Sequence, residues 1–138
     1  KMEAIVGSAQ GGIYYGRPGI VDKVEDLPKA KGIIFGHGTG GVPTTFVVST
    51  KLLDIKPQKI VLAYPSSAES RRAFLAGEIN FTGETSPSFA AGVKPYADSG
   101  EIVLLFQTGV LDEKGNLSRS PFLPANLILL LHRILRRK

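Results

Sequence analysis

The stretch GIIFGHGTGG, residues 32–41, has the form of a strand that runs through a glycine-rich loop toward a helix. The apolar run at 32–35 precedes the loop, and residues 44–54, which have helical spacing of apolar side chains, follow it. Glycine lets a backbone approach a ligand closely, and the first N–H groups of a helix have no partners within the helix. The stretch therefore predicts an anion-binding site at residues 36–41.

Short strands and short helices alternate along the rest of the chain. Strands are predicted at 3–7, 13–16, 32–35, 59–64, 78–82 and 101–107, and helices at 22–30, 44–54, 66–76, from Ser86 with a restart at Pro95, and at 125–137. This alternation predicts an α/β fold, a layered sheet flanked by helices. The nearly continuous apolar run at 59–64 predicts a parallel strand covered on both faces. No repeat or linker interrupts the pattern, so residues 1–138 are interpreted as a single domain.

Composition limits the classes of function. With 138 residues, of which 43% are hydrophobic, the chain can bury a core. The formal net charge is +5, but four of the 17 basic residues lie in the last six positions, and the remainder nearly balance the 12 acidic residues. A basic tail on a neutral body does not favour nucleic-acid binding. The absence of cysteine excludes disulfides and thiol chemistry, and no apolar run approaches the ~18–20 residues that span a bilayer.

The glycine loop also satisfies the dinucleotide fingerprint G-x-G-x-x-G at residues 36–41. That fingerprint requires an acidic residue at the end of the following strand, and the chain has none at 63–65. Arg71 and Arg72 could hold a 2′-phosphate, but they lie more than one turn into their helix. A dinucleotide- or nucleotide-binding domain of an enzyme, using Gly36 to Gly41, is therefore kept as the alternative function.

Two further polar loops are expected at the same edge of the sheet. Residues 64–69 follow the next strand, and residues 82–86 follow the one after it. Ser66 and Glu69 fit a capping box, which leaves Tyr64 and Ser67 to face a crevice. In the third loop Ser86 is the predicted helix cap, and the hydroxyls of Thr39, Thr44 and Thr45 lie beside the glycine loop. In open α/β sheets, loops at this edge form the ligand crevice.

Residues suited to catalysis are few. The chain has two histidines, His37 and His132, no cysteine and no G-x-S-x-G motif. Glu78 and Glu84 lie six residues apart across a strand and a loop, a spacing that does not specify paired acid–base chemistry. The sequence predicts binding rather than turnover, with no catalytic residue and no metal site.

Several motifs, in order and spacing, resemble the solute-receptor proteins of tripartite tricarboxylate transporters. They are VEDL at 24–27 with FGHGTGG at 35–41, YPSSAE at 64–69 with LAGE at 75–78, GEIVLLFQTG at 100–109, and RSP at 119–121 with LP at 123–124. The resemblance covers about residues 13 to 124.

The resemblance implies a bacterial periplasmic or extracellular binding protein of the type II periplasmic-binding-protein-like fold. Two α/β lobes of such a protein close on a small organic carboxylate, and the full-length protein delivers it to membrane transporter subunits. It implies no enzyme activity, no cofactor and no nucleic-acid partner. Family members hold the carboxylate through backbone N–H groups and hydroxyls, which in this chain would belong to Gly38, Thr39, Gly40 and Ser67, with Tyr64 and Thr85 in addition.

The chain departs from the family in length and at its C-terminus. Family members are roughly twice as long, so residues 1–138 are expected to be the second, ligand-binding lobe of a larger protein. Residues 125–138 form a divergent, basic segment where the family has an acidic one. A third hypothesis follows from the C-terminal arginines Arg133, Arg136 and Arg137. It is a basic interaction domain that binds nucleic acid or anionic lipid with steep salt dependence.

Overall fold

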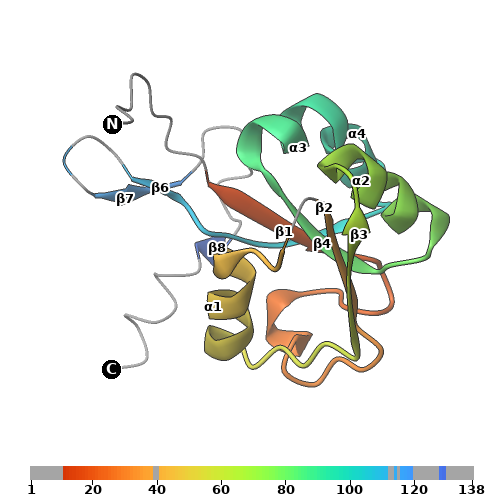
Figure 1. Ribbon diagram of the computed structural model, residues 1–138. Coiled ribbons are helices and arrows are strands. Elements are labelled where there is room, and N and C mark those ends of the chain that lie inside the picture. Colours follow the sequence, from red (N-terminus) through yellow and green to blue (C-terminus); the bar gives the residue numbers. More distant parts are fainter. Residues whose placement is uncertain (1–10, 39–40, 112–113, 115, 120–127, 130–138) are drawn as a thin grey trace, which may run out of the picture.

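The computed structural model describes residues 11–38, 41–111, 114, 116–119 and 128–129. Within these residues one six-stranded sheet has the order β3-β2-β4-β1-β5-β8 (Figure 1). Its strands are β1 (Gly12–Gly16), β2 (Ile34–Gly38), β3 (Lys59–Tyr64), β4 (Phe81–Thr85), β5 (Val103–Gln107) and β8 (Ile128–Leu129). The helices are the 3-10 helix η1 (Val24–Asp26), α1 (Thr44–Leu52), α2 (Ser67–Ala76), α3 (Ser86–Gly92) and α4 (Lys94–Asp98). The predicted α/β fold with a helix-flanked sheet is confirmed.

The order of the strands creates a switch point at β2. Strand β2 is parallel to both β3 and β4, so the chain passes through α1 to one neighbour of β2 and returns through α2 to the other. Strand β1 lies antiparallel between β4 and β5, with Gly12 opposite Thr85 at one end. Connections that diverge from the carboxyl ends of parallel strands leave a crevice between them.

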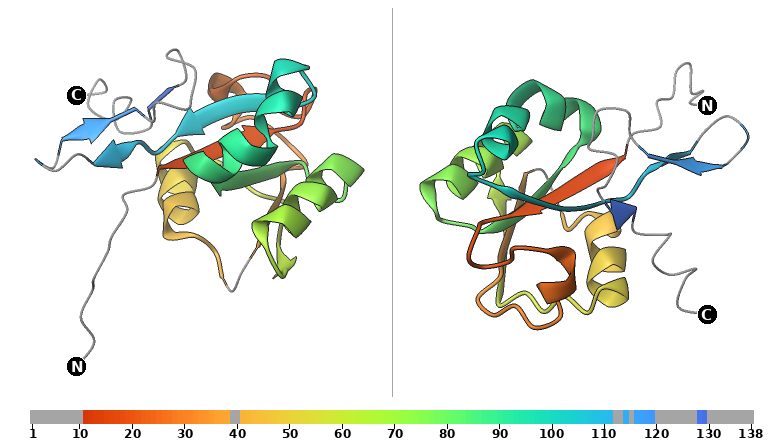
Figure 2. Two further views of the ribbon diagram at one scale, coloured as in Figure 1. Left: turned by 90° about the horizontal axis from the view of Figure 1, so that it is seen from above. Right: turned by 180° about the vertical axis from the view of Figure 1, so that it is seen from behind.

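The two faces of the sheet have separate cores. Figure 1 shows α1 and the η1 segment on one face, and α2, α3 and α4 together on the other. The first core contains Phe35, Phe46 and Phe81, and the second contains Phe74 and Phe89. Successive side chains of a strand point to opposite faces, so Tyr14 belongs to the first core and Tyr15 to the second. A hairpin of β6 (Val110–Leu111) and β7 (Leu117–Ser118) extends beyond the helices (Figure 2).

Local sequence signals correctly place the start or end of most helices. Helix α2 begins after Ser66, whose Oγ accepts a hydrogen bond from the Glu69 N–H at 3.2 Å. It ends at Gly77, which has the left-handed φ of 87° that glycine adopts without strain. The predicted restart at Pro95 is confirmed by α4. The helix predicted at 22–30 is shorter, since the structure has the 3-10 helix η1 at Val24–Asp26 followed by turns, and Asp22 accepts a hydrogen bond from the Gly19 N–H instead of capping a helix.

The prediction that the strand at 59–64 is covered on both faces is wrong. The side chains of Ile60 and Leu62 in β3 are 45% and 39% exposed, because this strand forms an edge of the sheet and has β2 as its partner. An apolar run does not distinguish a central strand from an edge strand. Among the apolar side chains with helical spacing at 44–54, Phe46 and Leu53 are buried while Val47 is exposed.

Two further boundaries differ from the sequence prediction. The strand predicted at 78–82 begins at Phe81, because the side chain of Asn80 bonds the Ile34 N–H and the Gly32 carbonyl, each at 2.8 Å. Thr85 caps α3, where Ser86 was predicted to do so.

Ile128 and Leu129 belonged to the predicted C-terminal helix and instead form β8, parallel to β5. The rest of that segment and the predicted strand at 3–7 lie outside the described residues. None of the helices in the described part of the chain is long and apolar enough to cross a membrane.

Candidate functional site

A pocket of about 310 Å³ opens at the carboxyl ends of β2 and β4. Its walls come from five elements that are distant in sequence: the ends of β2 and β4, the start of β1, and the first turns of α1 and α2. The lining residues are Gly11, Gly12, Tyr14, His37, Gly38, Pro43, Thr45, Ser67, Gly83, Glu84 and Thr85. The pocket therefore lies at the switch point that the strand order creates.

Gly38 brings the start of α2 against the end of β2. A Cβ at this position would lie 2.2 Å from the carbonyl carbon of Ser66 and 2.6 Å from the Ser67 nitrogen. Contacts below 3.0 Å to backbone atoms cannot be relieved by a side-chain rotation. Gly38 is thus required for close packing, whatever else the glycine loop holds.

The first turns of two helices line the pocket with incompletely satisfied donors. Pro43 is the N-cap of α1 and provides no side-chain hydrogen bond to it. In α2 the cap of Ser66 accepts from a single N–H, while Ser67 lines the pocket. The predicted capping box is half formed, because the carboxylate of Glu69 pairs with Arg72 on the surface. Backbone N–H groups at a helix start favour a bound anion.

Tyr14 forms an aromatic wall with a hydroxyl at its tip. Its ring stacks on Phe106 with 4.7 Å between centroids, and its hydroxyl shares a 2.6 Å hydrogen bond with Thr45 Oγ1. Burial raises the pKa of the Tyr14 phenol, which the hydrogen bond to Thr45 only partly offsets. The phenol is therefore protonated at neutral pH and joins β1 to α1 across the pocket.

His37 is the histidine of this pocket. Its ring stacks on Phe35, with an interplanar angle of 11° and 6.1 Å between centroids. Burial lowers the pKa of the imidazole, more than the Gly83 backbone and the charge of Glu84 raise it. His37 is thus neutral at pH 7 and adds no positive charge to the site.

The lowered pKa of His37 predicts a loss of stability in acid. Below the ordinary histidine value of about 6.5, the unfolded chain takes up a proton that folded His37 resists, so the free energy of unfolding falls as the pH falls. Urea unfolding at pH 7.5 and pH 5.5 measures the difference. The decrease should be smaller in His37→Gln than in the parent, and an equal decrease in both proteins would rule out His37 as its source.

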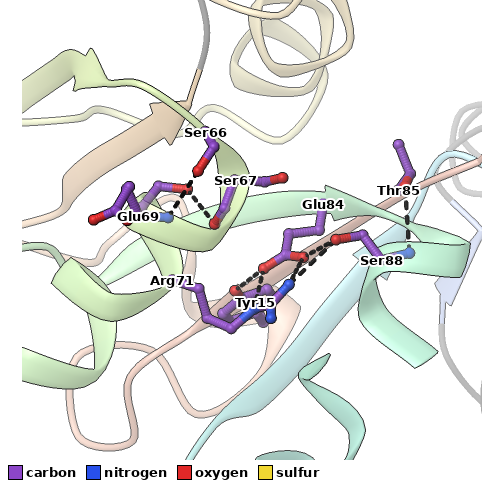
Figure 3. A network of polar contacts seen from close by, with 9 residues as sticks. Tyr15, Ser66, Ser67, Glu69, Arg71, Glu84, Thr85 and Ser88 are labelled. Carbon is purple, nitrogen blue, oxygen red and sulfur yellow. Dashed lines mark hydrogen bonds and ion pairs between the residues drawn. The ribbon is translucent and has the colours of Figure 1, made fainter. Parts of the chain in front are cut away.

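Glu84 lines the pocket, but its carboxylate is bonded to other protein groups. The side chain is fully buried and accepts hydrogen bonds from Arg71, Tyr15 and Ser88 (Figure 3). The hydrogen bond with Glu84 raises the pKa of the Arg71 guanidinium above its ordinary value. Arg71 and Arg72 are thus each engaged with a carboxylate, which leaves neither arranged for a 2′-phosphate.

The structure brings together three of the six residues predicted from the sequence to bind ligand. Gly38, Ser67 and Thr85 line the pocket, whereas Thr39 and Gly40 lie outside the described residues. Tyr64 is not among the lining residues, and its side chain packs against the second core. The roles of all six residues in ligand binding remain predictions.

Sequence reasoning missed the wall contributed by β1. Gly11, Gly12 and Tyr14 line the pocket because β1 inserts antiparallel beside β4, a pairing between segments about 70 residues apart. The adjacent glycines Gly11 and Gly12 were the available signal, since glycine pairs often mark close backbone approach. A Cβ on Gly11 would lie 2.7 Å from the Gly109 carbonyl oxygen.

Two segments of the chain meet at the rim of the pocket. The Gly12 N–H donates to Thr108 Oγ1 at 2.8 Å, and the Thr108 N–H donates to the Gly12 carbonyl at 2.9 Å. The start of β1 and the end of β5 are thus joined beside the pocket. Among the described residues, no three histidine or acidic side chains gather as metal ligands would.

Comparisons with known proteins bear on the fold. No protein-family model matches the chain, and no curated protein matches it. The structure of the periplasmic binding protein BugD matches 91% of this chain with a TM-score of 0.65 at 14% sequence identity. MatC (Rpa3494) from Rhodopseudomonas palustris with bound malate matches 76% with a TM-score of 0.52 at 10% identity. A periplasmic transporter structure matches 80% with a TM-score of 0.51 at 17% identity.

The matched structures are longer than this chain, which spans 40% of the BugD chain and 35% of the MatC chain. At these identities the similarity concerns the fold. The mixed sheet flanked by helices is the α/β fold found in periplasmic binding proteins.

Proposed function

We propose that this chain is the ligand-binding lobe of an extracytoplasmic solute-binding protein, and that its pocket takes a carboxylate group of a small organic molecule. The observation that carries the proposal is the convergence of two helix starts and several hydroxyl groups on one pocket at the switch point of the sheet. The proposal includes delivery to a tripartite tricarboxylate-type transporter, which rests on the sequence resemblance.

Neutral donors are well suited to a carboxylate in this pocket. The two oxygens of a bound carboxylate can accept hydrogen bonds from backbone N–H groups at the starts of α1 and α2 and from the hydroxyls of Thr45, Ser67 and Thr85. Hydrogen bonds to a charged acceptor contribute about 1.5–3 kcal/mol each. The 310 Å³ volume lies at the lower end of the range for small-molecule sites, about 300–1,000 Å³.

The alternative of a dinucleotide-binding enzyme domain has less support. Its fingerprint glycine Gly38 is explained by the packing of α2, and β3 ends at Tyr64 without the required acid. Arg71, the residue considered for a 2′-phosphate, is bonded to Glu84. The proposal assigns the pocket to binding, and the carboxylate of Glu84, which lines it, is already bonded to Arg71, Tyr15 and Ser88.

The proposed cellular context is the periplasm or the extracellular side of a bacterium. The structures with similar folds include a periplasmic binding protein, BugD, and a periplasmic transporter. A third, MatC, was determined with malate bound. The proposed partners are a small organic carboxylate and, through the full-length protein, membrane transporter subunits. No cofactor or nucleic acid enters the proposal.

Titration of the ¹⁵N-labelled chain with malate, succinate and citrate tests the proposal. We expect saturable amide shifts at Gly38, Ser67 and Thr85, and no saturation with the uncharged diamide of succinate. Ser67→Ala should weaken binding about 10-fold or more, given the loss of one hydrogen bond to a charged group. Ser99→Ala, a change at an exposed hydroxyl at the end of α4, is the matched control and should leave binding unaltered.

Two outcomes would count against a carboxylate site. The first is an absence of saturable shifts with every carboxylate, both here and in the two-lobed protein. The second is saturable NADPH or ATP binding that Gly38→Val abolishes, which would favour the nucleotide alternative.

A further inference from the structure

We infer that Arg71 and Glu84 are a positioning pair that holds the first turns of α2 and α3 at the pocket. Neither charged group contacts the ligand in this scheme. The inference rests on the proposed function only in its last step, because the geometry it predicts also exists in the ligand-free protein.

The carboxylate of Glu84 is fully committed to protein partners. Its side chain has no exposed surface, and Oε1 accepts from Arg71 Nε and from the Tyr15 hydroxyl, each at 2.9 Å. Oε2 accepts from Arg71 Nη2 at 2.6 Å and from the Ser88 hydroxyl. The fork of the guanidinium thus grips both oxygens of one carboxylate, an arrangement that fixes orientation as well as distance (Figure 3).

Two partners of Glu84, Arg71 and Tyr15, belong to elements that wall the pocket, and the third, Ser88, belongs to α3, whose N-cap Thr85 lines it. Arg71 stands four residues after Ser67, so the two lie on the same side of α2 about one turn apart. Ser88 lies in the first turn of α3, and its N–H donates to the capping hydroxyl of Thr85. Glu84 itself stands between Gly83 and Thr85, both of which line the pocket. One carboxylate therefore ties α2, one turn past its start, and the first turn of α3 to the sheet.

A glycine at position 92 leaves space for the guanidinium of Arg71. A Cβ on Gly92, the last residue of α3, would lie 2.0 Å from Arg71 Nη1 and 2.6 Å from Cζ. The end of α3 thus approaches the guanidinium as closely as a residue without a side chain permits. A pair formed only for stability has little advantage over apolar packing, since desolvation offsets much of the attraction between buried charges. Fixed geometry at the pocket gives the pair a role that apolar residues would not fulfil.

The ligand-free protein provides the first test. Arg71→Lys retains the charge but loses the planar fork, and Glu84→Gln retains the shape but loses the charge. We expect both variants to shift the Ser67 and Thr85 amide resonances in ¹H–¹⁵N spectra. The matched control is Arg72→Lys, next along the same helix, whose pair with Glu69 is exposed. Unchanged Ser67 and Thr85 amides in both pair variants would overturn the inference, whether or not the parent binds a carboxylate.

A double-mutant cycle on binding provides the second test, with malate as the probe. If the pair positions Ser67, Ser67→Ala should weaken binding about 10-fold in the parent and less than about 3-fold in the Arg71→Lys background. The Arg72→Lys background should retain the full 10-fold effect. Equal losses in all three backgrounds would show that Arg71 affects only stability and would overturn the positioning role.

Thermal unfolding of each variant separates folding from positioning. A variant that is folded at the assay temperature, with dispersed resonances, enters the cycle, and Glu84→Gln replaces Arg71→Lys if the latter does not fold. Failure of the parent to shift with malate, succinate or citrate would contradict the proposed function alone. Retention of normal Ser67 and Thr85 amides in the pair variants would contradict the positioning pair alone.

Discussion

Replacing Phe46 with alanine is expected to lower the free energy of unfolding by about 3–5 kcal/mol, the usual cost of removing a fully buried phenylalanine. The Phe46 side chain is buried against Phe35, at 3.5 Å between nearly parallel rings, and against Phe81 and Tyr14. Its loss opens a cavity among aromatic rings that a neighbouring side chain cannot fill by rotation. Urea denaturation of the parent and variant measures the change.

Helix α1 supplies the control for this substitution. Val47 follows Phe46 directly and is 46% exposed, so Val47→Ala should cost less than about 1 kcal/mol. Because Thr45 precedes Phe46 and bonds Tyr14, the Phe46 variant should also disturb the pocket. Similar small losses in the two variants would show that α1 does not anchor the first core.

Gly38→Ala is expected to destabilise the protein by about 1–3 kcal/mol or more and to abolish ligand binding. The new Cβ would meet the Ser66 carbonyl group at 2.2–2.4 Å, so α2 must move away from β2 and take Ser67 with it. Denaturation and carboxylate titration of the same sample measure both effects.

Gly41→Ala is the matched control in the same glycine-rich stretch. Within the described part of the chain, no atom outside the adjoining residues lies within 4 Å of a Cβ at Gly41, and its φ is not in the left-handed region. We expect nearly parental stability for this variant. Equal destabilisation by the two substitutions would indicate that the stretch requires glycine for conformational freedom rather than for the approach of α2.

The fold class was predictable because the signals that define it are local. The alternation of apolar runs and helix caps indicates an α/β sheet, and the serine at 66 with the glycine at 77 delimits α2 to within one residue. Sheet position was not predictable in the same way. The exposure of Ile60 and Leu62 depends on what lies beside and above β3, which the run of apolar letters does not encode.

The candidate site was predictable at the ends of parallel strands and not elsewhere. Gly38 and Thr85 are the last residues of β2 and β4, and Ser67 comes shortly after β3, so a switch-point argument places them together. Tyr14 escaped prediction because it comes from an antiparallel strand whose neighbours are decided by long-range pairing. Glu84 was noted without a partner, since its contacts with Tyr15 and Arg71 join three separate elements.

The join between Gly12 and Thr108 has a mechanical consequence. The chain enters β1 at Gly12 and leaves β5 at Thr108, and these two residues are bonded to each other. The two connecting segments therefore lie side by side next to the pocket. In the two-lobed protein proposed above, the second lobe would be connected through these two segments. Because the pocket lies next to them, a modest rotation about them would close its mouth while the sheet stays rigid. In that protein, ligand binding and rotation of the lobes would be coupled.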